Sequence, residues 1–311
     1  MADPLRVATF NTELSRKGPG LLLRDILEGD DAQITAVLDT LVQADADIIA
    51  LQGFDYDLEG RALAAFARAL AEHTAPYPYQ FAAPPNAGRM TQVDLDGDGK
   101  THTPRDAQGF GRFFGEGAMA VLSRYPIDLA GVQDFSTRLW ADMPDTLFPA
   151  GAAFQQGRPL QRLSSHGHWS LPIEHPDFGR INILTFHATP PVFDGPEDRN
   201  GRRNHDEILF WQHHLAGDIG REPQGAFVLM GDANSDPNKG ESRRSAITNL
   251  LADARLQDPL PDQDTVLWPQ TGPMRVDYVL PSTEWRVVGA SVLGGWDAAS
   301  RHRLVWVDLV K

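Results

Sequence analysis

A set of imidazole, carboxylate and amide side chains stands at the ends of predicted strands, where acid–base chemistry is often carried out. The set comprises Asn11, His187, Asp232, Asn234, Asp277 and His302. Carboxylates and imidazoles exchange protons near neutral pH, and amides donate hydrogen bonds to anions. Each residue alone also has a structural interpretation, because an aspartate after a strand is usually a turn or cap residue. The prediction of an active site therefore requires a fold that brings the set to one edge of a sheet.

Alternating apolar runs and amphipathic stretches predict an α/β fold that places the set in this way. Strands are predicted at 6–10, 48–51, 118–122, 181–186, 227–230, 276–280, 285–293 and 304–309. Helices are predicted at about 34–42, 63–70, 205–215 and 245–251, where apolar residues recur at helical spacing. Segments 84–114 and 134–168 lack periodicity and are interpreted as irregular. No linker is evident, so we predict a single domain over residues 1–311, with mixed sheets covered by helices.

The composition is that of a globular protein, and its charge bears on the partners. With 41% hydrophobic residues the chain can form a substantial core. A formal net charge of −14 disfavours tight nucleic-acid binding, although a hydrolase can meet such a substrate briefly when metal ions supply positive charge. The absence of cysteine excludes disulfides and thiolate chemistry. No apolar run long enough for a membrane span and no signal peptide is evident, and the oligomeric state is left open.

Six motifs resemble, in their order along the chain, those of the endonuclease/exonuclease/phosphatase superfamily, the DNase I-like proteins. They are residues 8–11 (ATFN), 47–52 (DIIALQ), 120–127 (AVLSRYPI), 231–234 (GDAN), 275–280 (RVDYVL) and 300–302 (SRH). The resemblance extends from residue 5 to residue 309. It implies a four-layer α/β/β/α sandwich built from two mixed sheets.

The resemblance also implies catalytic roles. Asp232 would align the attacking water or act as its base, and Asn234 would hold a phosphate oxygen. Asp277 would orient His302, which would contact the phosphoryl group and help to stabilise the transition state. His187 lies where secreted nuclease-like and sphingomyelinase-like members keep a second catalytic histidine. Phosphate diesters repel hydroxide, so a divalent cation together with imidazolium or amide donors would offset the charge that develops on the oxygens.

The metal site departs from the family pattern at two positions. The glutamate that normally follows Leu-Gln is Gly53 here, and the aspartate that often precedes the last histidine is Arg301. We predict a relocated Mg²⁺ or Mn²⁺ site, with Asn11 and Asp55 as metal ligands and Glu13 as a further candidate. Two alternatives remain open: a metal-poor site in which Arg301 clamps the phosphate, and an inactive relative that only binds its ligand.

Two further motifs bear on ligands. Asp94, Asp96 and Asp98 match the first half of a calcium loop, so they form a candidate structural Ca²⁺ site; the alternative is a solvated acidic turn. The twelfth position of that loop is Arg105, and Asp106 follows it as a candidate substitute ligand.

Arginines are concentrated after His187 in this otherwise acidic chain. Arg199 and Arg203, together with Arg301, are predicted to bind substrate, because guanidinium groups suit phosphate oxygens. The alternative is a loop in which arginines pair with Glu197 and Asp198.

The favoured function is a metal-dependent hydrolase of phosphate esters, a phosphodiesterase or phosphatase acting on a small or lipid-derived ester. Acidity, the candidate calcium loop and the lack of cysteine favour a secreted or periplasmic bacterial enzyme. The first alternative is a DNase I-like endonuclease, so nucleic acid is a less favoured substrate. The second alternative, of another class, is a non-catalytic relative that binds a phosphate ligand.

Overall fold

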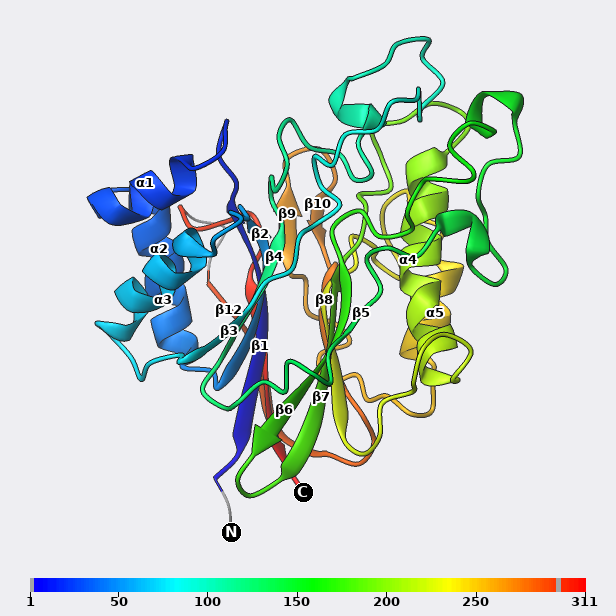
Figure 1. The fold of residues 1–311 in the computed structure, drawn as a ribbon. Helices are drawn as coiled ribbons and strands as arrows, with labels where there is room; N and C mark the ends of the chain where they lie inside the picture. Colours follow the sequence, from blue (N-terminus) through cyan, green and yellow to red (C-terminus); the bar gives the residue numbers. More distant parts are fainter. Residues whose placement is uncertain (1–2, 295–297) are drawn as a thin grey trace.

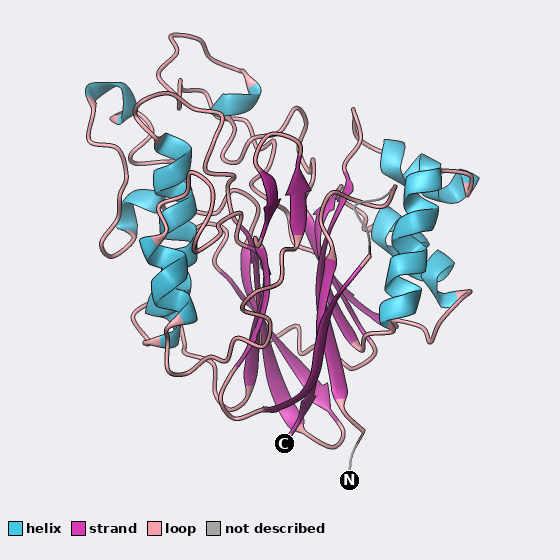
Figure 2. Ribbon diagram, turned by 180° about the vertical axis from the view of Figure 1, so that it is seen from behind, coloured by secondary structure: helices cyan, strands magenta, loops and turns pink. Residues whose placement is uncertain are grey.

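Two β-sheets lie face to face, with helices on the outer face of each, in the computed structural model of residues 3–294 and 298–311 (Figure 1, Figure 2). The first sheet has the order β12 (Arg286–Leu293), β13 (Leu304–Val310), β1 (Leu5–Leu14), β2 (Ile48–Phe54), β4 (Met119–Ser123), β3 (Tyr79–Phe81). The second has the order β11 (Asp277–Pro281), β8 (Phe227–Asp232), β7 (Gly179–His187), β6 (His168–His175), β5 (Gln133–Asp134). Each sheet is mixed, since β1 and β2 pair in parallel, as do β7 and β8.

Three apolar clusters hold the four layers together. Helices α1 (Leu21–Glu28), α2 (Ala32–Ala44) and α3 (Arg61–Ala71) pack on the first sheet, and α4 (Arg199–Leu215) and α5 (Ser245–Leu251) pack on the second. A third cluster, which includes Val7, Ile48, Leu171 and Val228, fills the space between the sheets. The predicted four-layer α/β/β/α sandwich of two mixed sheets is therefore confirmed.

Smaller elements complete the fold. β9 (Val266–Trp268) and β10 (Gly272–Met274) form a separate antiparallel hairpin, and single 3-10 turns lie at Pro104–Asp106, Trp140–Asp142 and Ala152–Phe154. In the part of the chain that the structure describes, no helix is both long and apolar enough to cross a membrane.

The register of the second sheet aligns three of the predicted site residues. His187 at the end of β7 pairs with Asp232 at the end of β8, and Asp232 pairs with Asp277 at the start of β11. Because β11 runs antiparallel to β8, its first residue meets the last residue of its neighbour. The three side chains are thus positioned by backbone pairing alone.

Five strands were not predicted: the short β3, β5, β9 and β10, and the longer β6, which a proline interrupts. β6 contains Pro172, a residue that cannot donate to a sheet ladder. The neighbouring β5 pairs with only Trp169 and Ser170, so Pro172 lies where β6 is an edge strand and no donor is required.

The fourth helix begins earlier than the apolar pattern predicts. α4 starts at Arg199 rather than near 205, and its first two turns bury polar side chains. Asn204 donates from within the helix to the carbonyls of Thr189 and Ala233, each at 2.8 Å. Buried polar residues of this kind leave no hydrophobic period for sequence reasoning to detect.

Candidate active site

The carboxylate of Asp232 is the point on which the predicted catalytic residues converge. Its Oδ2 accepts hydrogen bonds from the amide of Asn11 at 2.9 Å and from that of Asn234 at 3.3 Å. His187 Nε2 lies 3.4 Å from the same oxygen, and His302 Nδ1 lies 4.0 Å away. The two histidines, 115 residues apart in the chain, therefore flank one carboxylate.

His302 forms a buried pair with Asp277. Its Nδ1 lies 2.9 Å and 3.1 Å from the two carboxylate oxygens of Asp277. Thr265 Oγ1 donates to Asp277 Oδ2 at 2.8 Å, and the Trp268 ring meets the imidazole edge-on. An imidazole held at Nδ1 keeps its Nε2 in a fixed orientation. Thr265 and Trp268 were not found from the sequence, because the hairpin that carries Trp268 was not predicted.

The pKa of Asp232 is shifted toward neutral pH, and the pKa of His302 is shifted toward alkaline pH. Burial raises the pKa of Asp232, and the neighbouring charge of Asp277 raises it further. Burial would lower the pKa of His302, but the carboxylates of Asp277 and Asp232 outweigh it and raise that pKa. A base whose pKa lies near neutrality and an imidazolium that stays protonated are suited to opposite roles in one reaction.

As pH rises, we expect the Asp277→Asn variant to lose its activity earlier than the wild type does. The Asp277 charge raises the pKa of His302, so its removal lets the imidazolium deprotonate earlier as pH rises. The alkaline limb of a kcat/KM–pH profile should therefore shift toward neutral pH. An unchanged alkaline limb would show that the protonated form of His302 is not the one required.

A second histidine, His166, stacks on His187. The two rings are nearly parallel with their centroids 4.0 Å apart, and His166 Nδ1 donates to the His187 carbonyl at 3.2 Å. Burial lowers the pKa of His166 to about 4 and that of His187 well below its ordinary value, so both rings are neutral. His166 lies in the segment read as irregular, where no spacing linked it to His187.

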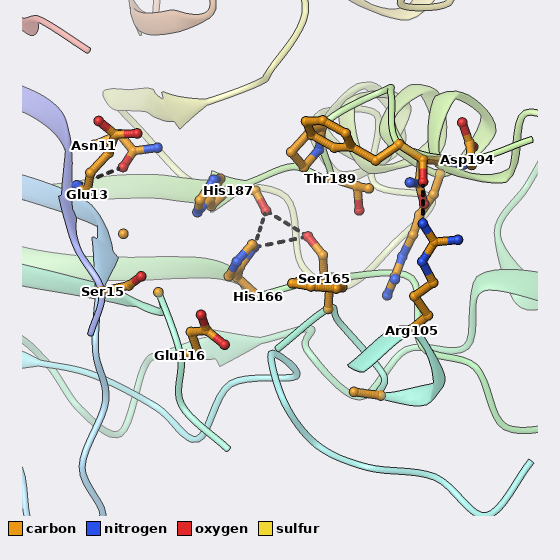
Figure 3. A pocket seen from close by; sticks show the side chains of 18 of the residues that line it. Asn11, Glu13, Ser15, Arg105, Glu116, Ser165, His166, His187, Thr189 and Asp194 are labelled. Atoms are coloured by element: carbon orange, nitrogen blue, oxygen red, sulfur yellow. Dashed lines mark hydrogen bonds between the residues drawn. The ribbon is translucent and has the colours of Figure 1, made fainter. Parts of the chain in front are cut away.

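A cleft of about 830 Å³ opens over these residues. Figure 3 shows Asn11 and Glu13 at one end, His187 and His166 in the middle, and Asp194 and Arg105 at the other end. Asp232, Asp277 and His302 are buried and do not line the cleft, but Asn11 and His187 both line it and contact Asp232. A ligand in the cleft would therefore reach the central carboxylate between these two residues.

The position of the missing family glutamate is filled by backbone and amide atoms. Gly53 has φ +66°, and a Cβ built there would lie 2.4 Å from Asn11 Oδ1 and 2.9 Å from the Glu13 amide nitrogen. The space that a side chain would take is thus occupied by the Asn11 amide. Asn11 Oδ1 also accepts a hydrogen bond from the Glu13 amide at 3.2 Å.

We expect Gly53→Ala to destabilise the protein more than Gly60→Ala, its matched control. Both glycines have φ +66°, but no atom lies within 4 Å of a Cβ at Gly60. The left-handed conformation costs each variant about 1–2 kcal/mol, and crowding adds about 1–3 kcal/mol at Gly53 alone. Urea unfolding would measure the difference, and activity should fall only in Gly53→Ala because Asn11 is displaced. Equal losses in the two variants would contradict the crowding.

Two oxygen ligands remain at this end of the cleft. Glu13 lines it beside Asn11, and its carboxylate pairs with the guanidinium of Arg301 and accepts from the Arg301 amide at 2.8 Å. Arg301 also lies over the Trp268 ring. Mg²⁺ is commonly bound by one or two protein oxygens together with water and substrate phosphate. Asn11 Oδ1 and Glu13 fit that chemistry, in competition with Arg301.

Asp55 and the cluster of Asp232, Asp277 and His302 are poorer metal sites. Both oxygens of Asp55 accept backbone amides, from Arg16 and Gly117 at 2.8 Å each, and Asp55 does not line the cleft. The ligand atoms of Asp232, Asp277 and His302 lie within 4.8 Å of one another, but these groups already bond to one another and to their neighbours.

The candidate calcium loop gathers three carboxylates. Oxygens of Asp94, Asp96 and Asp106 lie within 4.8 Å of one another, whereas Asp98 Oδ1 accepts from the Lys100 amide at 2.8 Å. Asp106 takes part in this group, and Arg105 lies 3.4 Å from Asp96. The structural Ca²⁺ site stays a prediction.

The predicted substrate-binding arginines have different surroundings. Arg203 is fully buried and donates to four carbonyls, so it ties loops together. Arg199 is 7% exposed and lines the cleft, and its Nε has no hydrogen-bond partner among the described residues. Arg301 is half-exposed at the opposite end of the cleft beside Glu13.

Comparison with known proteins gives the family to which this α/β/β/α sandwich belongs. The model of the Endonuclease/Exonuclease/phosphatase family matches residues 8–302, so the chain belongs to this family, whose members are hydrolases acting on phosphate esters. The resemblance seen in the sequence is thereby confirmed. A search of curated proteins finds no match.

Solved structures share the fold at low sequence identity. An endonuclease/exonuclease/phosphatase from Beutenbergia cavernae is 19% identical with a TM-score of 0.62, over 99% of this chain and 72% of that one. Sphingomyelinase C from Streptomyces griseocarneus is 18% identical with a TM-score of 0.52, over 99% of each chain. A mannosyl-6-phosphatase from Bacteroides thetaiotaomicron is 15% identical with a TM-score of 0.54, over 99% and 100%.

Proposed function

We propose that this protein is a divalent-cation-assisted phosphodiesterase or phosphatase, in which Asp232 activates water and His302 stabilises the transition state. The observation that carries the proposal is the placement of His187 Nε2, Asn11 Nδ2 and Asn234 Nδ2 around one buried carboxylate oxygen. The non-catalytic alternative is disfavoured, because burying three ionisable groups together is costly and a site that only holds an anion does not need that carboxylate.

The chemistry follows from the pKa directions. Burial and Asp277 raise the pKa of Asp232 toward neutrality, so its carboxylate can take a proton from water. His302 does not line the cleft, but a phosphoryl group that enters between Asn11 and His187 and reaches Asp232 would lie beside it; His302, kept protonated by Asp277, would then donate to a phosphoryl oxygen on which negative charge builds. His187 is neutral, so it acts as a relay: it accepts the proton that Asp232 has taken from water, across the 3.4 Å between Asp232 Oδ2 and His187 Nε2, and gives a proton to the leaving oxygen.

A divalent cation would offset phosphate charge at the end of the cleft formed by Asn11 and Glu13. Asn11 Oδ1 and the Glu13 carboxylate would hold it, and Arg301, released from Glu13, would then bind a phosphate oxygen. This arrangement takes the place of the family carboxylates that Gly53 and Arg301 replace here.

Release of nitrophenol from bis-nitrophenyl phosphate tests both the proposed hydrolysis and its dependence on a divalent cation. After chelation we expect the rate to fall at least about tenfold and to return with Mg²⁺ or Mn²⁺, and Glu13→Gln should need more cation for half-maximal rate. Full activity in chelator would assign the positive charge to Arg301 alone. If no phosphate ester is hydrolysed with any of the cations, the proposed enzymatic activity is refuted.

A nuclease of the same fold is the second candidate, and the family match supports it. The net charge of −14 disfavours it. Degradation of plasmid DNA at a rate above that of the nitrophenyl ester would favour the nuclease.

A further inference from the structure

The cleft continues well beyond the catalytic centre, into a region that phosphate chemistry leaves unexplained. This distal half is formed by Asp96, Thr189, Phe193, Asp194, Glu197 and Arg199. Figure 3 shows Thr189, Asp194 and Arg105 on the far side of His187 from Asn11 and Glu13. A phosphoryl group beside Asp232 would therefore direct the rest of the ester either into the distal half or out to solvent.

Several polar atoms in the distal half are buried without a partner. Within the described residues, Arg199 Nε, Thr189 Oγ1 and Asp96 Oδ1 have no hydrogen bond, and Arg199 is 7% exposed. A buried polar group without a partner costs about 1–3 kcal/mol, so such groups usually mark a place where a ligand or water completes the bonding. The Asp96 oxygen also belongs to the candidate calcium site, but Arg199 Nε and Thr189 Oγ1 do not, and these two indicate a ligand with several polar atoms.

The charges of the distal half are mixed. The carboxylates of Asp96, Asp194 and Glu197 line the same cleft as the Arg199 guanidinium. A second phosphate or a carboxylate would meet these three negative groups, so the region does not suit an anionic tail. An acyl chain would leave the charged groups desolvated and unpaired. Hydroxyl groups both donate and accept, and they match a wall in which donors and acceptors alternate.

An exposed aromatic ring completes the region. Phe193 is 78% exposed at the cleft, next to Asp194 in sequence, and its carbonyl accepts from Arg105 at 3.2 Å. Exposed apolar side chains beside convergent polar groups are typical of ligand sites. The C–H face of a sugar ring is apolar while its edge carries hydroxyls, so it can contact the phenyl ring and the polar wall together.

We infer that the distal half of the cleft is a binding subsite for a hydroxyl-rich leaving group, so that the substrate is a sugar or polyol phosphate ester. The hydrolysis of such an ester rests on the proposed function, whereas binding to the subsite can be measured without any reaction. Arg199 donates to hydroxyl oxygens, and Thr189 and Glu197 accept from hydroxyl hydrogens. Arg199, Glu197 and Phe193 set specificity, because they contact the part of the ester that does not react.

The test compares glucose 6-phosphate with phenyl phosphate and hexyl phosphate. We expect the wild type to favour glucose 6-phosphate in kcat/KM. We expect Arg199→Met to lose at least about tenfold on glucose 6-phosphate and less than about threefold on phenyl phosphate, since a site built for hydroxyls discriminates through them. Glu197→Gln and Phe193→Ser should change in the same direction. Leu58→Ser, at another exposed apolar residue that does not line the cleft, is the matched control.

Each outcome decides the inference. Equal losses on all three esters, or a wild type that prefers phenyl phosphate or hexyl phosphate, would overturn the subsite. If Arg199→Met does not fold, the exposed Phe193→Ser variant gives the answer.

If the wild type hydrolyses none of the esters, the proposed function fails, but calorimetric titration still decides the subsite. We then expect glucose 6-phosphate to bind more tightly than inorganic phosphate, and to lose that advantage in Phe193→Ser. Equal binding of the two ligands would overturn the inference.

Discussion

His302→Ala should reduce kcat on bis-nitrophenyl phosphate by about 10³–10⁴-fold while KM changes little. The imidazolium is the buried cation next to Asp232, and its alignment by Asp277 keeps it charged at neutral pH. Its contribution is made mainly when negative charge develops on the phosphoryl oxygens, so the loss falls on kcat rather than on ground-state binding.

The control for this variant is His73→Ala, at an exposed histidine outside the site. It should retain wild-type activity, and circular dichroism should show both variants folded. A His302→Ala enzyme within tenfold of wild type would contradict the role assigned to the imidazole.

Asp232→Asn should reduce kcat by about 10²–10⁴-fold. The amide keeps the size of the carboxylate but cannot accept a proton from water. Its NH₂ group would also face the amide of Asn11 in place of the oxygen that accepts from it at 2.9 Å. Rates measured across pH should lose the acidic limb that the ionisation of Asp232 gives to the wild type.

Removal of the buried charge separates the catalytic role from a structural one. Burial raises the pKa of Asp232, so the carboxylate is held at a cost, and Asp232→Asn should keep or raise the melting temperature while activity falls. Asp262→Asn, at an exposed position, serves as the control. The double variant with His302→Ala should be little worse than either single one, because groups that act as a unit are not additive. A strictly multiplicative loss would contradict a shared mechanism.

The convergence of the site could be predicted from the sequence because it depends on strand ends. Asp232 and Asp277 sit at strand termini that short apolar runs make visible, and backbone pairing places them opposite each other. The Gly-Asp-x-Asn motif and the final histidine stand in the order along the chain that the family motifs have. Local pattern and fold agree at these positions. The predicted sandwich and the predicted location of the site at one edge of its sheets both rest on that agreement.

What escaped prediction depends on buried polar contacts. Glu207 looks like a solvent-facing helix residue, yet its oxygens accept from the amides of Ser165 and Thr189, at 2.6 Å each. It thereby fixes the two segments on either side of the His166–His187 stack. The Glu207 carboxylate thus bonds to Ser165, which lies 42 positions earlier in the chain, and to Thr189, which lies 18 positions earlier. No periodicity of the sequence indicates contacts of this kind. The first turns of α4 and the extent of the cleft could not be predicted for the same reason, because they too depend on buried polar contacts.

The position of β13 ties the completion of the candidate site to the completion of the first sheet. This strand comes later in the sequence than the other strands of that sheet, yet it lies inside the sheet between β1 and β12, directly after His302. The helices and the whole second sheet can therefore form while the first sheet stays split. The imidazole of His302 reaches Asp277 only when that gap closes, so the buried cluster is completed in the same step as the first sheet.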